Sequence, residues 1–245
     1  MKISVITVCY NAASTLERTI RSVLEQSYPN IEYIVIDGNS TDGTCEIIKR
    51  YSDRVSKFIS EPDRGIYDAM NKGIALAEGD YINFMNAGDV FSSPDAIRDV
   101  VELADKNADV IYGYSTVVLP NGKKKISPCD SFDLIKKRPI YRHNASFTKT
   151  SLHKQYPFDL TKSGIFKYAL DYDNIFRLFS IGANFQKVDV DVVTWDKEGT
   201  SDNPIRNVKL TFKISHQFRK PTLKEYAIYF YDIIKACRRE LLKRL

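Results

Sequence analysis

Four short apolar segments in the first 90 residues most constrain what this chain can fold into. They are Lys2–Val8, Ile31–Ile36, Lys57–Ser60 and Asp80–Met85, and helix-forming segments separate them at Thr15–Gln26, Thr44–Tyr51 and Gly65–Ala77. Short segments that are apolar and rich in β-branched residues are typical of strands buried on both faces of a parallel sheet. Their alternation with helices predicts a right-handed, mostly parallel α/β sheet flanked by helices.

Polar residues follow each of these predicted strands. Cys9–Asn11, Asp37, the Glu61–Arg64 loop and Asn86–Asp89 all come at or just after a strand end. Open α/β sheets bind their ligands outside the carboxyl ends of the strands. We therefore expect these turns to meet at one edge of the sheet and to form the functional site there.

The second half of the chain is less regular. The pattern predicts a hairpin at 108–126 around Asn121-Gly122, a helix at 168–181, a strand at 185–194 and a terminal helix at 223–245. Ser14 and Glu17 have the spacing of a capping box for the first helix. With no repeat and no linker, one domain over residues 1–208 and a helical tail over 209–245 is the expected organisation.

Composition excludes several classes of protein. A hydrophobic share of 43% and a charged share of 27% are ordinary for a globular chain. The four cysteines are scattered, and neither a secretion-type start nor an apolar stretch of about 18 residues is present, so we expect a cytoplasmic protein. The sequence also lacks the glycine motifs of P-loop NTPases and of dinucleotide oxidoreductases.

A first group of candidate binding residues comprises Tyr10, Asp37, Asp63 and Arg64. A carboxylate can accept a hydrogen bond from a base or a ribose, and arginine can donate a forked pair to a carbonyl or a phosphate. Tyrosine can stack on a base. Alternatively, Asp37 begins a turn, and Asp63 and Arg64 form a surface ion pair.

Asn86-Ala87-Gly88-Asp89 is a second candidate, for a metal-bound phosphate. Mg²⁺ takes oxygen ligands, usually one or two carboxylates together with substrate phosphates. Asp89 could supply one such ligand, and Gly88 would let a diphosphate approach the backbone. The alternative is that Asp89 caps a following helix near Pro94.

Asp171 and Asp173 are candidates for a general base, which would take a proton from an acceptor hydroxyl. Two acidic residues in the first turn of a helix also favour its dipole, so a structural role is the alternative. His143 could contact a diphosphate or the metal, although a lone histidine is more often structural.

The terminal helix carries an apolar stripe and a strong positive charge. From residue 209 to 245 there are ten Lys or Arg and three Asp or Glu, a net charge of +7, whereas residues 1–208 carry −2. The stripe consists of Leu223, Ala227, Phe230, Ile234, Cys237 and Leu241. This amphipathic pattern favours an anionic membrane surface, with packing against the domain or a partner subunit as the alternative, and nucleic-acid binding as a remote third possibility.

Five segments together resemble the family 2 glycosyltransferases, the inverting enzymes of the GT-A fold. They are Ser4–Asn11, Val35–Thr44, Ser60–Asp89, Arg142–Phe147 and Asp171–Leu178, and they occur in the order of the family. The segment from Glu61 to Gly73 resembles the corresponding segment of enzymes that build bacterial surface polysaccharides. The resemblance implies a nucleotide-sugar-binding half over residues 1–90 and an acceptor and catalytic half over 91–208.

The resemblance also implies roles for single residues. Tyr10, Asp37 and Arg64 would hold the nucleotide, with Asp63, Asn86 and His143 also in the nucleotide-sugar site. Asp89 would bind Mg²⁺ or Mn²⁺ on the diphosphate, and Asp171 would be the base. We thus expect an inverting, non-processive enzyme that moves one sugar from a nucleotide sugar, with a UDP-sugar as the preferred donor. The expected acceptor is a saccharide or lipid-linked saccharide at the inner face of the membrane.

This sequence departs from the family pattern at two positions. Gly88-Asp89 stands where relatives often have two adjacent acids, and Leu170-Asp171 stands where they often have Glu-Asp. The second departure keeps Asp173 as a rival base. A non-catalytic nucleotide-sugar-binding or scaffold protein and a sugar nucleotidyltransferase are the alternative functions, but the second needs a glycine-rich loop that Cys9–Ala12 does not provide.

Overall fold

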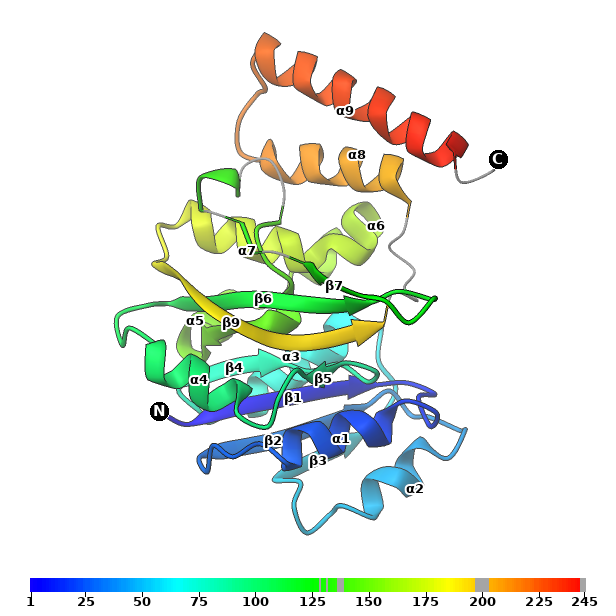
Figure 1. The fold of residues 1–245 in the computed structure, drawn as a ribbon, viewed down its shortest axis with the longest axis vertical. Coiled ribbons are helices and arrows are strands. Elements are labelled where there is room, and N and C mark those ends of the chain that lie inside the picture. Colours follow the sequence, from blue (N-terminus) through cyan, green and yellow to red (C-terminus); the bar gives the residue numbers. More distant parts are fainter. Residues whose placement is uncertain (128, 131, 136–138, 197–202, 243–245) are drawn as a thin grey trace.

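The computed structural model describes residues 1–127, 129–130, 132–135, 139–196 and 203–242. The first 90 residues alternate between strands and helices as expected. Their elements are β1 (Ile3–Cys9), α1 (Leu16–Leu24), β2 (Ile31–Asp37), α2 (Thr44–Lys49), β3 (Lys57–Ser60), α3 (Ile66–Leu76) and β4 (Tyr81–Phe84). The strands lie in the order β3-β2-β1-β4 and all run parallel, which confirms the predicted parallel sheet for this half (Figure 1).

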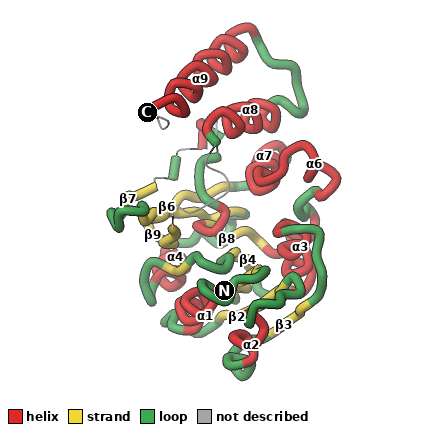
Figure 2. Tube along the Cα trace, turned by 90° about the vertical axis from the view of Figure 1, so that its right-hand side faces the viewer, coloured by secondary structure: helices red, strands yellow, loops and turns green. Residues whose placement is uncertain are grey.

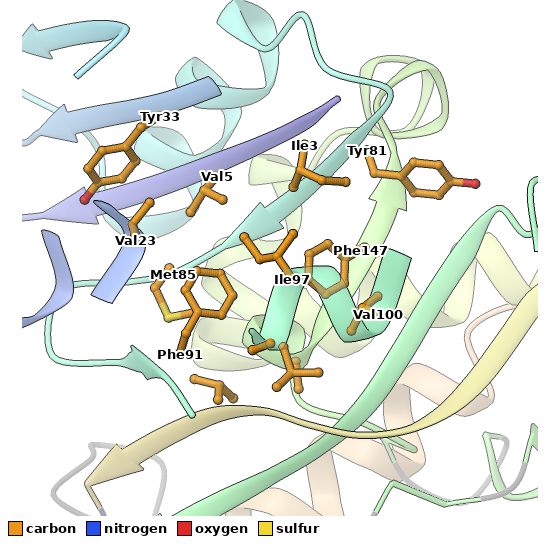
Figure 3. Close-up of a cluster of buried hydrophobic side chains, with 14 of the residues drawn as sticks. Ile3, Val5, Val23, Tyr33, Tyr81, Met85, Phe91, Ile97, Val100 and Phe147 are labelled. Atoms are coloured by element: carbon orange, nitrogen blue, oxygen red, sulfur yellow. The ribbon is translucent and has the colours of Figure 1, made fainter. Parts of the chain in front are cut away.

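Alternating side chains of β1 build a core on each face of the sheet. Ile3 and Val5 belong to the cluster that faces α1 and α4, whereas Ile6 and Val8 belong to the cluster on the α3 side. All four are at most 4% exposed. Figure 3 shows the first cluster, in which side chains from β1, α1 and α4 meet. A strand that is apolar on both faces therefore lies at the centre of the sheet, as its sequence indicates.

The second half of the chain extends the same sheet with mixed strand directions. It contributes β5 (Val90–Phe91), α4 (Ala96–Leu103), β6 (Val110–Val118), β7 (Lys124–Ser127), β8 (Ser146–Lys149), α5 (Thr150–Gln155) and β9 (Phe185–Asp196). The order continues from β4 through β8, β6 and β9 to β5, and β7 pairs with β6. Only β6 and β9 pair in parallel here, so the sheet is mixed beyond β4. The predicted hairpin is confirmed as β6 and β7.

The remaining helices stack above the sheet. They are α6 (Ser163–Phe166), α7 (Leu170–Ser180), α8 (Pro204–Ser215) and α9 (Leu223–Leu242). α8 packs between α7 and α9, and α9 forms the outermost layer (Figures 1 and 2). The sequence pattern did not predict α8. The division at residue 208 stays a prediction, and that residue lies within this helix.

One expected helix cap and one alternative reading are wrong. Thr15 rather than Ser14 occupies the N-cap position of α1, because the helix starts one residue later than the Ser14–Glu17 pattern requires, and no side chain among the described residues makes the capping hydrogen bond. Asp89 does not cap a helix either, since β5 follows it and Asp95 precedes α4. The last three residues of the predicted terminal helix lie outside the described residues. No helix in the described ranges combines the length and apolarity needed to span a bilayer.

Candidate active site

The strand order places the expected site between β1 and β4. In the order β3-β2-β1-β4 the chain leaves β1 in one direction to form β2 and β3, and returns on its other side as β4. A crevice forms outside the carboxyl ends of the strands at such a switch point. Tyr10 and Asn11 follow β1 there, and Asn86–Asp89 follow β4.

Tyr10 and Asp63 both lie next to Gly38, the residue directly after β2. A side chain at position 38 would come within 2.6 Å of the Asp63 carboxylate and 3.2 Å of the Tyr10 ring, so only glycine fits without displacing them. The Tyr10 ring is 66% exposed, and Asp63 accepts a hydrogen bond from the Gly65 amide. The structure thus brings together two of the residues expected to hold the nucleotide, with an exposed ring available for stacking.

Asp37, the last residue of β2, is buried, and its carboxylate accepts hydrogen bonds from several neighbouring groups of the protein. Its carboxylate accepts from the Ser40 amide at 2.9 Å, the Ser60 hydroxyl at 2.7 Å, the Ser40 hydroxyl and the Cys45 thiol. Burial would raise the pKa of Asp37, but these hydrogen bonds outweigh it and the pKa is lowered. In this structure Asp37 therefore fastens the loop after β2, and its direct contact with a base stays a prediction.

Arg64 lies at the start of α3 and makes its contacts within that helix. Its guanidinium pairs with Asp68 at 3.2 Å, and 78% of its side chain is exposed. The side chain is long and accessible, so it can turn toward a ligand at the Tyr10–Asp63 pair. Its role in binding the nucleotide stays a prediction.

The loop after β4 is held from α1. Gly88 has a φ of +103°, which an L side chain rarely adopts, so glycine is required for this turn. The Thr19 hydroxyl accepts from the Gly88 amide at 2.9 Å and donates to the Asp89 carbonyl at 2.8 Å. Arg18 donates to the Gly88 carbonyl and pairs with Asp196, at the end of β9, at 2.6 Å. The loop that presents Asp89 is therefore fixed.

The surroundings of Asp89 fit a divalent cation on a diphosphate. Its carboxylate accepts from the Asn144 amide at 2.9 Å, and burial raises its pKa against the opposing effects of Asn144 and nearby cationic groups. The side-chain oxygens of Asn86 and Asn144 are buried and receive no hydrogen bond from any residue that the structure describes. No three His, Cys, Asp or Glu side chains converge on a metal position within the described ranges. One carboxylate suits Mg²⁺ or Mn²⁺ when substrate phosphates supply further ligands.

A short 3₁₀ turn, His143–Ala145, joins this loop to the expected base. The Nε2 atom of His143 lies 3.0 Å from the Asn86 amide nitrogen, and its Nδ1 lies 3.4 Å from the Asp171 carboxylate. Both ring nitrogens are therefore engaged by the protein, and each can make only one such bond. His143 thus bridges Asn86 and Asp171, and its expected contact with the nucleotide sugar stays a prediction.

Asp171 is held at the start of α7 with part of its carboxylate accessible. It accepts from the Tyr172 amide at 2.9 Å and lies 3.3 Å from the Tyr67 hydroxyl, which also donates to the Tyr168 carbonyl at 2.8 Å. Burial would raise the pKa of Asp171, but His143, the Tyr172 amide and the charge of Arg142 outweigh it and lower the pKa. With 29% of its side chain exposed, Asp171 is an ionised carboxylate that a hydroxyl can reach.

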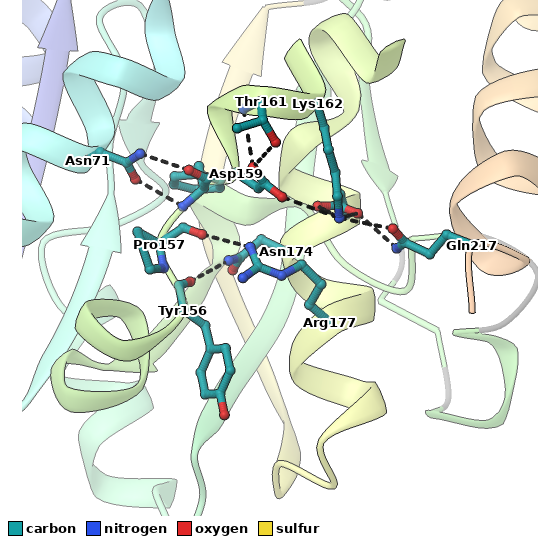
Figure 4. A network of polar contacts seen from close by, with 11 residues as sticks. Asn71, Tyr156, Pro157, Asp159, Thr161, Lys162, Asn174, Arg177 and Gln217 are labelled. Carbon is teal, nitrogen blue, oxygen red and sulfur yellow. Dashed lines mark hydrogen bonds and ion pairs between the residues drawn. The ribbon is translucent and has the colours of Figure 1, made fainter. Parts of the chain in front are cut away.

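Asp173 is in different surroundings. Only 1% of its side chain is exposed, and its carboxylate pairs with Lys162 at 3.1 Å and accepts from Gln217 at 2.8 Å. Figure 4 shows Lys162 and Gln217 meeting in a network that links the segment before α6 to the chain after α8. Asp173 thus holds helices together, and of the two candidates Asp171 is the accessible one.

A sequence model of glycosyl transferase family 2 matches residues 4–168, about two thirds of the chain. The chain belongs to this family. The match includes the loops that carry Tyr10, Asp37, Arg64 and Asp89, and it ends three residues before Asp171.

Relatives within family 2 agree with this membership. A glycosyltransferase of Mycobacterium tuberculosis H37Rv, described only as uncharacterised, is 36% identical over 155 residues, which cover 61% of this chain and 59% of the relative. The putative teichuronic acid biosynthesis glycosyltransferase TuaG of Bacillus subtilis is 40% identical over 90 residues, 36% of either chain. The chain therefore aligns with less than two thirds of the length of these relatives.

Solved structures of low sequence identity share the GT-A fold. A Pyrobaculum calidifontis mannosyltransferase in complex with GDP-Man and Mn²⁺ has a TM-score of 0.71 at 19% identity, covering 97% of this chain and 73% of that one. Staphylococcus aureus TarS 1–349 in complex with UDP-GlcNAc has a TM-score of 0.69 at 17% identity, covering 96% and 72%. These similarities confirm the predicted fold class.

Several residues of this family 2 site were not singled out from the sequence. Arg18, Tyr67, Asn144 and Trp195 acquire their places from contacts between segments far apart in the chain. Arg142 and Asn144 flank His143 in a segment that the family resemblance includes. The signal available in the sequence was the run of three consecutive polar residues, 142–144, directly after Tyr141.

Proposed function

We propose that this chain is an inverting glycosyltransferase that moves one sugar from a nucleotide sugar to a saccharide acceptor. One observation carries the proposal: the turn at 143–145 ties the loop of Asp89 to Asp171, so that a carboxylate suited to the divalent cation of a diphosphate lies in the same site as an accessible carboxylate. A nucleotide sugar whose diphosphate is held through a cation at Asp89 would then present its anomeric carbon toward the side from which Asp171 can act.

In the proposed reaction Asp171 takes the proton of the acceptor hydroxyl. The acceptor oxygen forms a bond to the anomeric carbon as the bond from that carbon to the diphosphate oxygen breaks. The nucleoside diphosphate leaves with the bonding electrons, and attack from the opposite face inverts the configuration. Tyr67 and the Tyr172 amide hold one carboxylate oxygen of Asp171, while His143 fixes the other, so the base is oriented before the acceptor arrives.

Asp89 would hold Mg²⁺ or Mn²⁺, and the bound cation would supply charge neutralisation for the departing diphosphate. The exposed Tyr10 ring would stack on the base, and Asp63 and Arg64 would contact the nucleoside next to it. UDP is the nucleotide that we propose, because UDP is bound in the TarS and glucosyl-3-phosphoglycerate synthase structures of the same fold. GDP is the alternative, since the Pyrobaculum calidifontis mannosyltransferase structure holds GDP-Man. We propose a single transfer per acceptor in the assembly of a surface polysaccharide. The similarity to TuaG, a putative teichuronic acid biosynthesis glycosyltransferase, supports the role in polysaccharide assembly.

The outer face of α9 supports a place at the inner face of the cell membrane, where a lipid-linked acceptor would be met. α9 packs on α8 through contacts such as that of Tyr229 with Phe212. Its opposite side leaves the apolar stripe exposed, with Phe230 60% and Ile234 69% accessible. The exposed charges on the same helix are Lys224, Lys235, Arg238 and Arg239. A helix that shows apolar and cationic side chains together is suited to an anionic lipid surface.

Reversing charges on α9 should release the protein from anionic vesicles. Each basic residue near such a surface contributes about 1 kcal/mol, so the triple variant Lys235→Glu, Arg238→Glu, Arg239→Glu should bind at least about 100-fold more weakly. The measurement is sedimentation with phosphatidylglycerol-containing vesicles, with pure phosphatidylcholine vesicles as the reference. A matched triple reversal at Lys49, Arg50 and Arg54, on the opposite end of the fold, should leave binding unchanged. Equal sedimentation of wild type and the α9 variant would contradict the membrane role.

The donor and the reaction can be tested together. We expect UDP with Mn²⁺ to raise the melting temperature of the purified protein more than GDP or dTDP does, and more than UDP without metal, because ligands that bind only the folded state stabilise it. Transfer from radiolabelled UDP-sugars to lipid-linked acceptors then measures catalysis. Stabilisation without transfer or donor hydrolysis would instead support a non-catalytic nucleotide-sugar-binding protein. No stabilisation by any nucleotide would contradict the proposal.

A further inference from the structure

Arg142 lies at the entrance to the turn at 143–145 and is held there by an aromatic ring. Its guanidinium carbon is 4.1 Å from the centre of the Trp195 ring, near the end of β9. Trp195 in turn donates a hydrogen bond to the Ser115 hydroxyl of β6 at 3.3 Å. A planar guanidinium stacked on a fixed ring loses less freedom when it binds a ligand than a mobile one does.

The guanidinium has no hydrogen-bonding partner in the described part of the chain. Arg18 and Arg64, at the same edge of the sheet, each pair with a carboxylate, at 2.6 Å and 3.2 Å respectively. Arg142 instead stacks on Trp195, and none of its N–H groups donates a hydrogen bond to a residue in the described part of the chain. Protein atoms lie around the guanidinium and partly desolvate it, but the Arg142 side chain as a whole remains accessible to solvent. Its five donors are therefore open to a ligand.

Arg142 also lies close enough to both carboxylates of the proposed site for their charges to act on it. Partial burial lowers the pKa of its guanidinium, while the charges of Asp171 and Asp89 both oppose that shift. Neither carboxylate forms an ion pair with it within the described residues. A cation that is influenced by both carboxylates but paired with neither among the described residues is suited to bind an anion at this site.

We propose that Arg142 binds the diphosphate of the nucleotide sugar, donating a forked pair of hydrogen bonds to its phosphate oxygens. This inference rests on the proposed function and assigns a substrate-binding residue that the sequence motifs did not. Guanidinium groups match phosphate oxygens in geometry and charge, and such bonds are stronger than those between neutral groups. As the diphosphate departs and gains charge, the same contact would strengthen, so Arg142 would also favour the leaving of the group.

The test compares UDP with uridine by calorimetry in the presence of Mn²⁺. Arg142→Met should weaken UDP binding roughly 10- to 100-fold, the effect of losing hydrogen bonds to a charged group, and should leave uridine binding unchanged. Arg142→Lys keeps the charge but loses the fork and the planar stack, so its UDP affinity should fall between the two. Arg98→Met, an exposed arginine of α4 that pairs with Asp95, is the matched control and should bind UDP as wild type does. If the thermal screen selects GDP, then GDP and guanosine replace the pair.

Three results would overturn the inference. Arg142→Met could bind UDP as tightly as wild type, it could lose uridine and UDP equally, or it could raise only the KM for the acceptor, which would assign Arg142 to the acceptor instead. Far-ultraviolet circular dichroism and the melting temperature of each variant establish that it is folded. A wild-type protein that binds no nucleotide would refute the proposed function itself, whereas a wild type that binds UDP alongside an unaffected Arg142→Met refutes only this assignment.

Discussion

Asp171→Asn should abolish sugar transfer while UDP still binds. The amide keeps the shape of the carboxylate and can still accept from the Tyr172 amide and the Tyr67 hydroxyl, but it cannot take a proton. General base catalysis typically contributes about 10²- to 10⁴-fold, and we expect kcat to fall by that factor. The UDP dissociation constant should change by less than about twofold, because no contact between this side chain and the nucleotide sugar is proposed. Steady-state transfer and calorimetry on the same preparation measure both.

Asp173→Asn is the matched control, two residues further along the same helix. Its carboxylate is buried against Lys162 and Gln217, so the substitution should lower stability by about 1–3 kcal/mol and leave kcat of the folded protein near wild type. The two variants are thus expected to separate rate from stability. If Asp171→Asn were fully active and Asp173→Asn inactive although folded, the base would be Asp173.

The lowered pKa of Asp171 sets the pH at which this role is lost. A carboxylate becomes protonated only as the pH falls through its pKa, and here that value lies below the ordinary value of about 3.9. The base is therefore ionised throughout the neutral and mildly acidic range. Any loss of transfer between about pH 8 and pH 5 must therefore come from another group. Its pH midpoint should be the same for the residual activity of Asp171→Asn as for wild type.

The second large effect is expected at Asp89. Asp89→Asn removes the one carboxylate proposed to hold the cation, so Mn²⁺ should no longer strengthen UDP binding, and transfer should fall by at least about 100-fold, corresponding to several kcal/mol of charge stabilisation. In the absence of metal the variant should bind UDP at least as well as wild type, since a negative charge near the diphosphate has been removed.

The control for this prediction is Asp99→Asn, an exposed carboxylate on α4. It should leave metal-dependent UDP binding and transfer unchanged. Calorimetric titrations of UDP with Mn²⁺, with Mg²⁺ and with a chelator give the comparison directly. Metal-dependent binding that survives in Asp89→Asn would remove this residue from the cation site.

The sequence was sufficient for the parts of the fold that depend on local pattern. The strands that start at Ile3 and Ile31 are apolar on both faces, and the structure has them paired in parallel at the centre of the sheet. The hairpin at Asn121-Gly122 depends on turn residues and was also predictable. Both features are determined by residues close together in the chain, which is where sequence patterns carry their information.

Features that depend on distant contacts could not be predicted in this way. β8 pairs with β4 and with β6, so its place needs the whole sheet. α8 starts with Asn203 as its cap and Pro204 in its first turn, a clear signal, but its apolar side faces two other helices and gives no simple stripe. The donors to Asp37 likewise come together only in the fold, because Ser40 lies in the loop after β2, Cys45 in α2 and Ser60 at the end of β3.

The turn at 143–145 has a consequence for how such an enzyme can be altered. Asn144 contacts Asp89 and His143 contacts both Asn86 and Asp171, so the proposed donor half and the proposed acceptor half are joined through adjacent residues. Exchanging the first 90 residues for those of a relative, in order to obtain a different donor, would therefore also change the groups that orient the proposed base. We expect donor preference and turnover to be coupled, and the turn of three residues to be the place where both would have to be redesigned together.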